Sequence, residues 1–172
     1  MKGAINITFA GLRLVAIALC GIFLVSCVVS PQRPAAQYSV SPQGPTEQAV
    51  AQAFEALVRA YGRQDWDDVM ALIADDAQIE PAVPHVAGPA GVDSPRVINK
   101  REFGQAIKPI LASIRGYHVE HVKLMTVSPT QVEVSGTVTL LMAGRPSLQD
   151  RNRLWVFEKR GERWLVVRAQ YL

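Results

Sequence analysis

An α+β fold is predicted by three features of the sequence. From residue 46 to residue 114 apolar residues recur at the spacing of amphipathic helices, whereas from residue 117 to the end they alternate with a period of two. Turn sequences interrupt the alternating part and divide it into strands that follow one another, as in an antiparallel meander. The helical segments come first and the strands follow, and this order is typical of α+β proteins.

The first 26 residues have the features of a secretory signal peptide. Lys2 and Arg13 precede an apolar run of twelve residues, 14–25, and no acidic residue occurs in this part of the chain. Twelve helical residues span only about 18 Å, whereas the hydrocarbon core of a membrane is about 30 Å thick. The run is therefore short for a membrane crossing and fits the apolar region of a signal peptide.

Residues 24–27, Leu-Val-Ser-Cys, resemble the lipobox of bacterial lipoproteins. The resemblance implies cleavage before Cys27 and lipid attachment to its thiol, as a diacylglyceryl cysteine with a further acyl chain such as palmitate on the new amino terminus. Two or more chains give stable anchoring. Because Val28 follows the cysteine, the resemblance also implies a bacterial envelope lipoprotein on the periplasmic face of the outer membrane. An ordinary signal peptide, or an uncut anchor that contains a cysteine by chance, is the alternative.

The mature chain would be nearly neutral and would have no free thiol, because Cys27 would be lipidated. Removal of residues 1–26 takes away Lys2, Arg13 and Cys20, and leaves 16 basic residues against 15 acidic ones. A nucleic-acid partner is therefore not expected. Residues 27–45 are rich in proline, glutamine and serine, so we predict that they tether the lipidated Cys27 to a domain that spans 46–172.

Two helices and a short strand are expected first in this domain. A stripe of apolar residues from Val50 to Tyr61 predicts an amphipathic helix that ends near Gly62. Asp65 can cap a second helix, with Asp68 at the capping-box position. The sequence ADDA at 74–77 closes this helix, and residues 77–80 alternate as a brief strand.

A proline-rich loop, a third helix and four strands complete the prediction. The loop covers 81–95, and Asn99 with Glu102 forms a second capping-box signature at the start of the helix. Pro109 should kink this helix or end it early. The strands are expected at 117–127, 132–142, 151–159 and 163–171, the last two as a hairpin.

The order of these elements, with DW at 65–66, ADDA at 74–77 and GERW at 161–164, resembles the nuclear transport factor 2-like fold. This superfamily includes SnoaL-like cyclases, ketosteroid isomerase and scytalone dehydratase. The resemblance covers 46–172 and implies a cone-shaped domain, in which three N-terminal helices pack on a curved, mainly antiparallel sheet and the open end forms an apolar pocket. The residues expected to line the pocket are Phe54, Leu57, Tyr61, Phe103 and Ile107.

The catalytic pattern of the ketosteroid isomerases is incomplete in this chain. Their motif, similar to ADDAxxEDP, supplies a general base from the aspartate before the proline, whereas residues 74–81 read ADDAQIEP. Alignment on ADDA deletes the base, and alignment on the proline lets Glu80 replace it, but Ile79 should face the core and Glu80 the opposite side. The oxyanion-stabilising tyrosine falls on Leu57, with Tyr61 one helical turn away. Such chemistry needs both groups together, so the isomerase activity is not transferred.

The other aspartates and the histidines do not form a catalytic or metal-binding pattern in the sequence. Asp75 and Asp76 are expected to serve a turn through bonds to nearby backbone amides. His118 and His121 should lie on opposite faces of a strand, and His85 lies in the proline loop. No metal site and no cofactor are therefore expected.

Charge is distributed unevenly along the domain. Residues 47–93 contain nine acidic and two basic residues, whereas residues 94–172 contain six acidic and thirteen basic residues. Arg151, Arg153 and Lys159 share one strand parity. They form either a docking face for an anionic partner or, as the preferred interpretation, a solvated outer sheet whose charges meet the acidic half within the fold.

The sequence thus favours a lipid-anchored envelope protein whose domain binds a partner protein or a small apolar ligand without catalysis. The alternative is an isomerase, dehydratase or cyclase that uses the apolar pocket, with Glu80 as the base and Tyr61 as a donor. Assembly of a homodimer through the outer face of the sheet is a further possibility.

Overall fold

The structure is a computed structural model that describes residues 36–81, 97–144 and 148–172 of the 172-residue chain. The predicted signal peptide, Cys27, His85 and most of the proline-rich loop lie outside the described residues. No helix in the described part of the chain is both long enough and apolar enough to cross a membrane.

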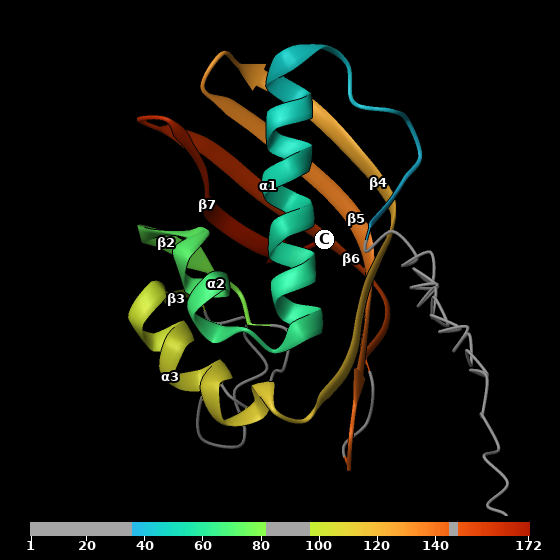
Figure 1. Cartoon of the computed structure of the whole chain (residues 1–172), viewed down its shortest axis with the longest axis vertical. Helices are drawn as coiled ribbons and strands as arrows, with labels where there is room; N and C mark the ends of the chain where they lie inside the picture. The colour runs from blue at the N-terminus through green and yellow to red at the C-terminus, as the bar shows by residue number, and fades with distance from the viewer. Residues whose placement is uncertain (1–35, 82–96, 145–147) are drawn as a thin grey trace, which may run out of the picture. The chain divides into compact units, whose positions relative to one another are not determined.

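One sheet of seven strands forms the centre of the described fold (Figure 1). The strands are β1 (Ala36–Tyr38), β2 (Ile73–Ile79), β3 (Ile98–Asn99), β4 (Ile114–Ser128), β5 (Gln131–Met142), β6 (Leu148–Arg160) and β7 (Arg163–Tyr171). Their order in the sheet is β1-β4-β5-β6-β7-β2-β3. Neighbours from β4 to β7 are antiparallel, as predicted, whereas β1 runs parallel to β4 and β2 runs parallel to β7.

Three helices of the described residues pack against this sheet, and the predicted α+β class is confirmed. They are α1 (Gly44–Arg63), α2 (Trp66–Ala71) and α3 (Lys100–Leu111). Figure 1 shows α1 crossing one face of the sheet, with α2 and α3 beside β2 and β3. The core lies between the helices and this face, where α1 buries Phe54, Leu57 and Val58.

The domain begins earlier than predicted, inside the segment assigned to the tether. Ala36 and Tyr38 of β1 pair with Val119 and Val122 of β4, and the backbone N–H of Ser39 donates to the carbonyl of Val122 at 2.9 Å. The Tyr38 hydroxyl donates to the carbonyl of Ala51 in α1 at 3.3 Å. Composition alone missed this strand, because a three-residue edge strand has too few positions to show a period.

The predicted capping residues mark the helix starts correctly, whereas the glycine predicted to end α1 does not end it. Asp65 accepts from the N–H of Asp68, and Asn99 with Glu102 forms the predicted capping box. Helix α1, however, passes through Gly62 and ends at Arg63, and Gln64 adopts the left-handed conformation with φ 61°. The side chain of Gln64 donates to the carbonyl of Ile114 at 2.6 Å, so a tertiary contact holds this residue.

Strand β2 also differs from the prediction, because it begins at Ile73 and contains the whole ADDA sequence. Ile73 pairs with Val166 of β7, and the N–H of Val166 donates to the carbonyl of Leu72 at 2.9 Å. Parallel pairing with the last strand of the chain therefore extends β2 in the N-terminal direction. Helix α3 likewise continues past Pro109 and ends at Leu111.

Candidate functional site

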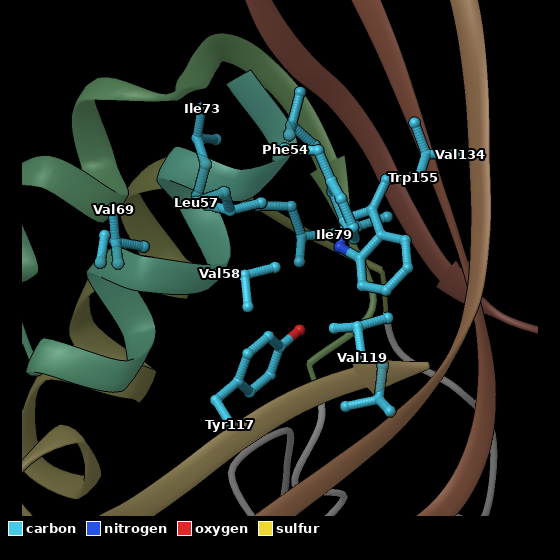
Figure 2. Close-up of a cluster of buried hydrophobic side chains, with 14 of the residues drawn as sticks. Phe54, Leu57, Val58, Val69, Ile73, Ile79, Tyr117, Val119, Val134 and Trp155 are labelled. Atoms are coloured by element: carbon cyan, nitrogen blue, oxygen red, sulfur yellow. The ribbon is translucent and has the colours of Figure 1, made fainter. Parts of the chain in front are cut away.

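An apolar cavity of about 30 Å³ lies between the helices and the sheet. Both α1 and α3 contribute to its wall, together with β2, β4, β5, β6 and β7, and Figure 2 shows part of the surrounding side-chain cluster. The described residues that line it are Leu57, Tyr61, Ile73, Ile79, Phe103, Ile107, Ile110, Ile114, Tyr117, Leu140, Arg153, Trp155, Val166 and Ala169.

Arg153 is the one charged residue in this lining, and its position corrects the sequence prediction. Arg151 and Lys159 are exposed as expected, but Arg153 is only 6% exposed. It shares its parity with Trp155 and Phe157, which are both buried on the same face of β6. That shared parity was visible in the sequence, but it did not show which part of the strand the helices cover.

Two hydrogen bonds to described residues hold the guanidinium of Arg153. Its Nη1 donates to the Tyr171 hydroxyl at 2.9 Å, and its Nη2 donates to the backbone carbonyl of Glu80 at 2.9 Å. It lies 4.8 Å from the ring centroid of Tyr171 and 5.8 Å from that of Trp155. These contacts fix the cation between the ends of β2 and β7.

Among the described residues, the same guanidinium lacks an acceptor at one atom and lacks a counter-ion. Its Nε is buried, and it has no hydrogen-bond partner among the described residues. Within the described ranges, no carboxylate oxygen lies within 4 Å of Arg153. A buried cation without a paired anion is costly, so this arrangement requires an explanation.

Two stacked tyrosines complete the polar part of the cavity. The rings of Tyr61 from α1 and Tyr117 from β4 are 4.7 Å apart with an interplanar angle of 23°. Neither hydroxyl has a hydrogen-bond partner in the described part of the chain. Figure 2 shows the Tyr117 hydroxyl directed toward the interior of the cluster.

Burial and nearby charges together set the pKa values of all three groups. It raises the pKa of Tyr61 and of Tyr117 well above the ordinary phenol value, although the nearby Arg153 acts in the opposite direction. Burial alone would lower the pKa of Arg153, but the oxygens of Tyr171, Tyr117 and Tyr61 offset this effect and the pKa is raised. The phenols therefore stay neutral and the guanidinium stays charged near neutral pH.

Four of the five predicted pocket residues line the cavity, namely Leu57, Tyr61, Phe103 and Ile107. Phe54 lies outside the lining. It is fully buried, and its ring packs edge-on against Trp155 and Phe157 at centroid distances of 4.9 and 6.3 Å.

Glu80, the candidate base, is not among the lining residues. It is half-buried at the end of β2, and its carboxylate accepts from the backbone N–H of Tyr171 at 3.0 Å. Ile79 faces the core, as predicted from alternation. The carboxylate of Glu80 and the hydroxyl of Tyr61 are therefore not brought together in the cavity.

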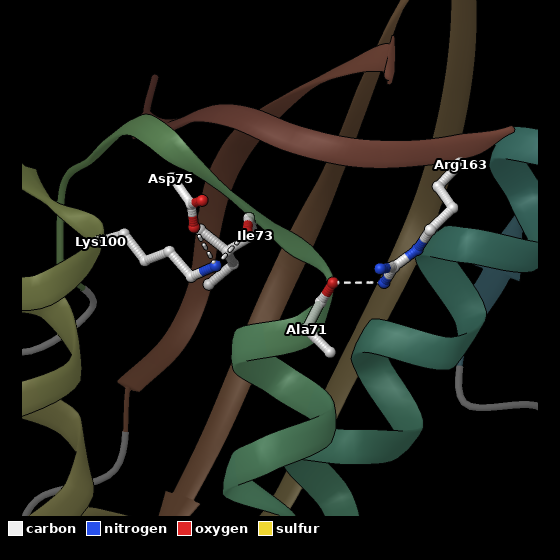
Figure 3. Close-up of polar contacts among 5 residues, drawn as sticks. All are labelled: Ala71, Ile73, Asp75, Lys100 and Arg163. Atoms are coloured by element: carbon white, nitrogen blue, oxygen red, sulfur yellow. Dashed lines mark hydrogen bonds and ion pairs between the residues drawn. The ribbon is translucent and has the colours of Figure 1, made fainter. Parts of the chain in front are cut away.

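Asp75 and Asp76 do not cap a turn, contrary to the sequence prediction. Figure 3 shows Lys100 reaching from the start of α3 to β2, where its Nζ donates to Asp75 at 2.8 Å and to the carbonyl of Ile73 at 2.7 Å. Asp76 pairs with Arg160 at 3.0 Å. Acidic residues of the first half thus meet basic residues of the second half within the fold.

The histidines show no shared site in the described ranges. His118 and His121 are both exposed, and a β-bulge with φ 53° at His121 interrupts the alternation on which the opposite-face prediction depended. Within the described residues, no group of three or more histidine, cysteine, aspartate or glutamate residues could hold a metal ion.

The helices, the strand order and the internal cavity together define a nuclear transport factor 2-like fold. Similar solved structures include a candidate scytalone dehydratase from Novosphingobium aromaticivorans, with a TM-score of 0.57 and 15% identity over 72% of this chain and 80% of that one. A candidate calcium/calmodulin-dependent protein kinase II association domain from Xanthomonas campestris gives a TM-score of 0.60 and 16% identity over 78% and 92% of the two chains. An NTF2-like protein from Cytophaga hutchinsonii gives a TM-score of 0.57 and 12% identity over 74% of this chain and 98% of that one.

These likenesses concern the fold alone, because the identities are low and the fold hosts unrelated functions. No protein-family model and no curated protein matches the sequence.

Proposed function

We propose that this chain is a lipid-anchored bacterial envelope protein whose nuclear transport factor 2-like domain binds a small, mainly apolar ligand without converting it. The observation that supports binding is the internal cavity, whose described lining is aliphatic and aromatic apart from Arg153 and two phenols. Ligand sites commonly combine such an apolar wall with a few convergent polar groups.

The protonation of the lining favours binding over catalysis. General acid-base catalysis needs a group whose pKa lies near the working pH. The raised pKa values of Tyr61, Tyr117 and Arg153 keep each of these groups in one protonation state near neutral pH. The carboxylate of Glu80 is engaged by the backbone of Tyr171, so it does not supply the missing base.

Isoleucine methyl groups allow the cavity to be tested directly. Five isoleucines line it, whereas Val132 is buried at the start of β5, outside the lining, and its methyl groups serve as an internal control. In methyl NMR spectra of the full-length protein in detergent, we expect xenon to shift the signals of the cavity isoleucines and to leave those of Val132 unchanged. The cavity isoleucines are Ile73, Ile79, Ile107, Ile110 and Ile114.

A cavity-filling variant provides the matched comparison. Leu140→Phe places a larger side chain in the lining and should abolish the xenon shifts, whereas Val127→Phe, at an exposed position on β4, should not. If xenon shifts none of the five isoleucines in the wild-type protein, the ligand-binding proposal is wrong. If a ligand co-purifying with the protein is chemically altered on incubation, the non-catalytic part is wrong.

Residues 24–27 and Val28 support the proposed anchor and its outer-membrane address. Cys27→Ala should release the protein from washed membranes, and mass spectrometry of the wild type should show the acyl mass on Cys27. A variant that still fractionates with membranes after washing would contradict this part of the proposal. The homodimer remains a prediction that light scattering can check.

A further inference from the structure

We propose that Arg153, together with the hydroxyls of Tyr61 and Tyr117, forms a carboxylate-binding subsite, and that the ligand is a short aliphatic monocarboxylate. This inference rests on the proposed ligand-binding function of the same cavity and specifies the chemistry of the ligand.

The charge balance of the cavity supports an anionic ligand. Arg153 is 94% buried, with an exposed fraction of 6%, and no described carboxylate pairs with it. A cation that is withdrawn from water without an anion destabilises the folded protein, because its lost hydration is not replaced. A bound carboxylate would supply the missing negative charge, and low local dielectric would strengthen the attraction.

The donors of the cavity match the oxygens of a carboxylate. Arginine has five N–H donors, and Arg153 forms two hydrogen bonds with described residues, one each from Nη1 and Nη2. The Nε–H is buried and has no acceptor in the described part of the chain. The neutral phenols of Tyr61 and Tyr117 can each donate one further hydrogen bond, so a planar anion with two oxygens can be satisfied.

The remaining lining favours a short apolar body with a single charge. A water molecule needs about 10–15 Å³ of such a cavity, so about 30 Å³ accepts a group of only a few heavy atoms. Most of the described wall consists of apolar side chains such as Leu57, Ile110 and Leu140, which offer no donors. A second negative charge, as on a dicarboxylate or a phosphate dianion, would be buried without a partner.

The test compares propionate with propionamide, its neutral analogue of nearly the same shape, on the full-length protein. Two signals report binding, namely the cavity isoleucine methyl groups and the Nε–H resonance of Arg153. At constant ionic strength we expect propionate to shift both signals saturably and to bind at least about tenfold more tightly than propionamide. This comparison uses the wild-type protein and does not depend on the folding of any variant.

Variants then assign the preference to the subsite. Arg153→Met should remove the preference for propionate, whereas Arg151→Met, at an exposed position on the same strand, should retain it. Tyr117→Phe should weaken the binding of propionate more than that of propionamide, because only the carboxylate forms a charge-assisted hydrogen bond with the Tyr117 hydroxyl.

The outcomes separate this inference from the proposed function. If propionate and propionamide bind equally, or if neither binds while xenon enters the cavity, the carboxylate subsite is wrong and the ligand-binding cavity stands. If none of the three probes reaches the cavity isoleucines, both proposals are wrong. Retention of the propionate preference in a folded Arg153→Met protein would also overturn the inference.

Discussion

Single charged residues in this domain act differently according to their burial. Lys100 and Arg163 each connect two elements at the surface, since Lys100 bonds to Asp75 and to the carbonyl of Ile73, and Arg163 Nη2 donates to the carbonyl of Ala71 at 2.6 Å (Figure 3). Arg153 bonds to a carbonyl in a similar way but lies inside the cavity wall. Lys100 is paired with Asp75 and Arg163 is exposed to solvent, whereas the interior cation depends on its few partners.

The pairing of Asp75 with Lys100 predicts a pH dependence of stability. The hydrogen bond and the charge of Lys100 lower the pKa of Asp75 below its ordinary value of 3.8. The pair therefore stabilises the folded protein at pH values above 3.8, and this contribution is lost as the pH falls through the lower, folded-state pKa. Urea unfolding should show a deficit for Asp75→Asn near neutral pH that disappears in acid.

A double-mutant cycle with Lys100→Met isolates this interaction from the bond that Lys100 makes to Ile73. The coupling should be small, because Asp75 is fully exposed, and it should weaken with added salt. A coupling that persists in acid, below the folded-state pKa of Asp75, would contradict the assignment.

Among the elements, β4 and β5 show how one small residue permits a bend. Strand β4 changes register between Glu120 and Lys123, where His121 has a positive φ. Opposite this bulge on β5 lies Gly136, at which a Cβ atom would come within 2.7 Å of Val119 and 3.2 Å of the carbonyl of Glu120. Since bulges increase the bend and twist of a strand, this contact helps to curve the sheet around the helices.

Gly136→Ala should therefore destabilise the domain. The added methyl group overpacks a site that contains backbone, so we expect a loss of about 1–3 kcal/mol in the free energy of unfolding. Gly62→Ala is the matched control, because no atom lies within 4 Å of its Cβ position and alanine favours the helix. Equal stability of Gly136→Ala and the wild type in urea unfolding would show that the sheet absorbs the methyl group.

At the scale of the whole molecule, the tyrosines link the cavity to global stability. The chain contains four, Tyr38, Tyr61, Tyr117 and Tyr171, and burial is the largest cause of a raised pKa at each of them. The unfolded chain ionises its phenols near pH 10, whereas the folded chain retains the protons to higher pH. The resulting stabilisation is fully present below pH 10 and is lost as the pH rises toward the folded-state pKa values.

Alkaline titration should therefore produce tyrosinate absorbance in one step that coincides with unfolding. The free energy of unfolding should fall by up to about 1.4 kcal/mol per pH unit for each buried tyrosine. Circular dichroism followed in parallel reports the fold, and Tyr117→Phe should reduce the slope. Gradual ionisation centred near pH 10 in a protein that stays folded would contradict the burial of these phenols.

The sequence predicts the fold better than the site. Hydrophobic periodicity located the long strands and α1, and the capping residues Asp65 and Asn99 located the starts of α2 and α3, because these signals are local. The start of β2 and the whole of β1 depend on parallel partners distant in the sequence, and they were missed. Arg153 was assigned to the outer surface, because strand parity gives the face of a side chain and not the coverage by helices.

The stacking of Arg153 near Trp155 has an optical consequence. A positive charge 5.8 Å from an indole centroid alters the electric field across the ring, and the wavelength of indole emission depends on that field. Neutralisation of the guanidinium by a bound anion would change this field without moving the tryptophan. In a protein that carries Trp66→Phe and Trp164→Phe, only Trp155 remains, and its emission wavelength would report whether an anion is bound beside Arg153.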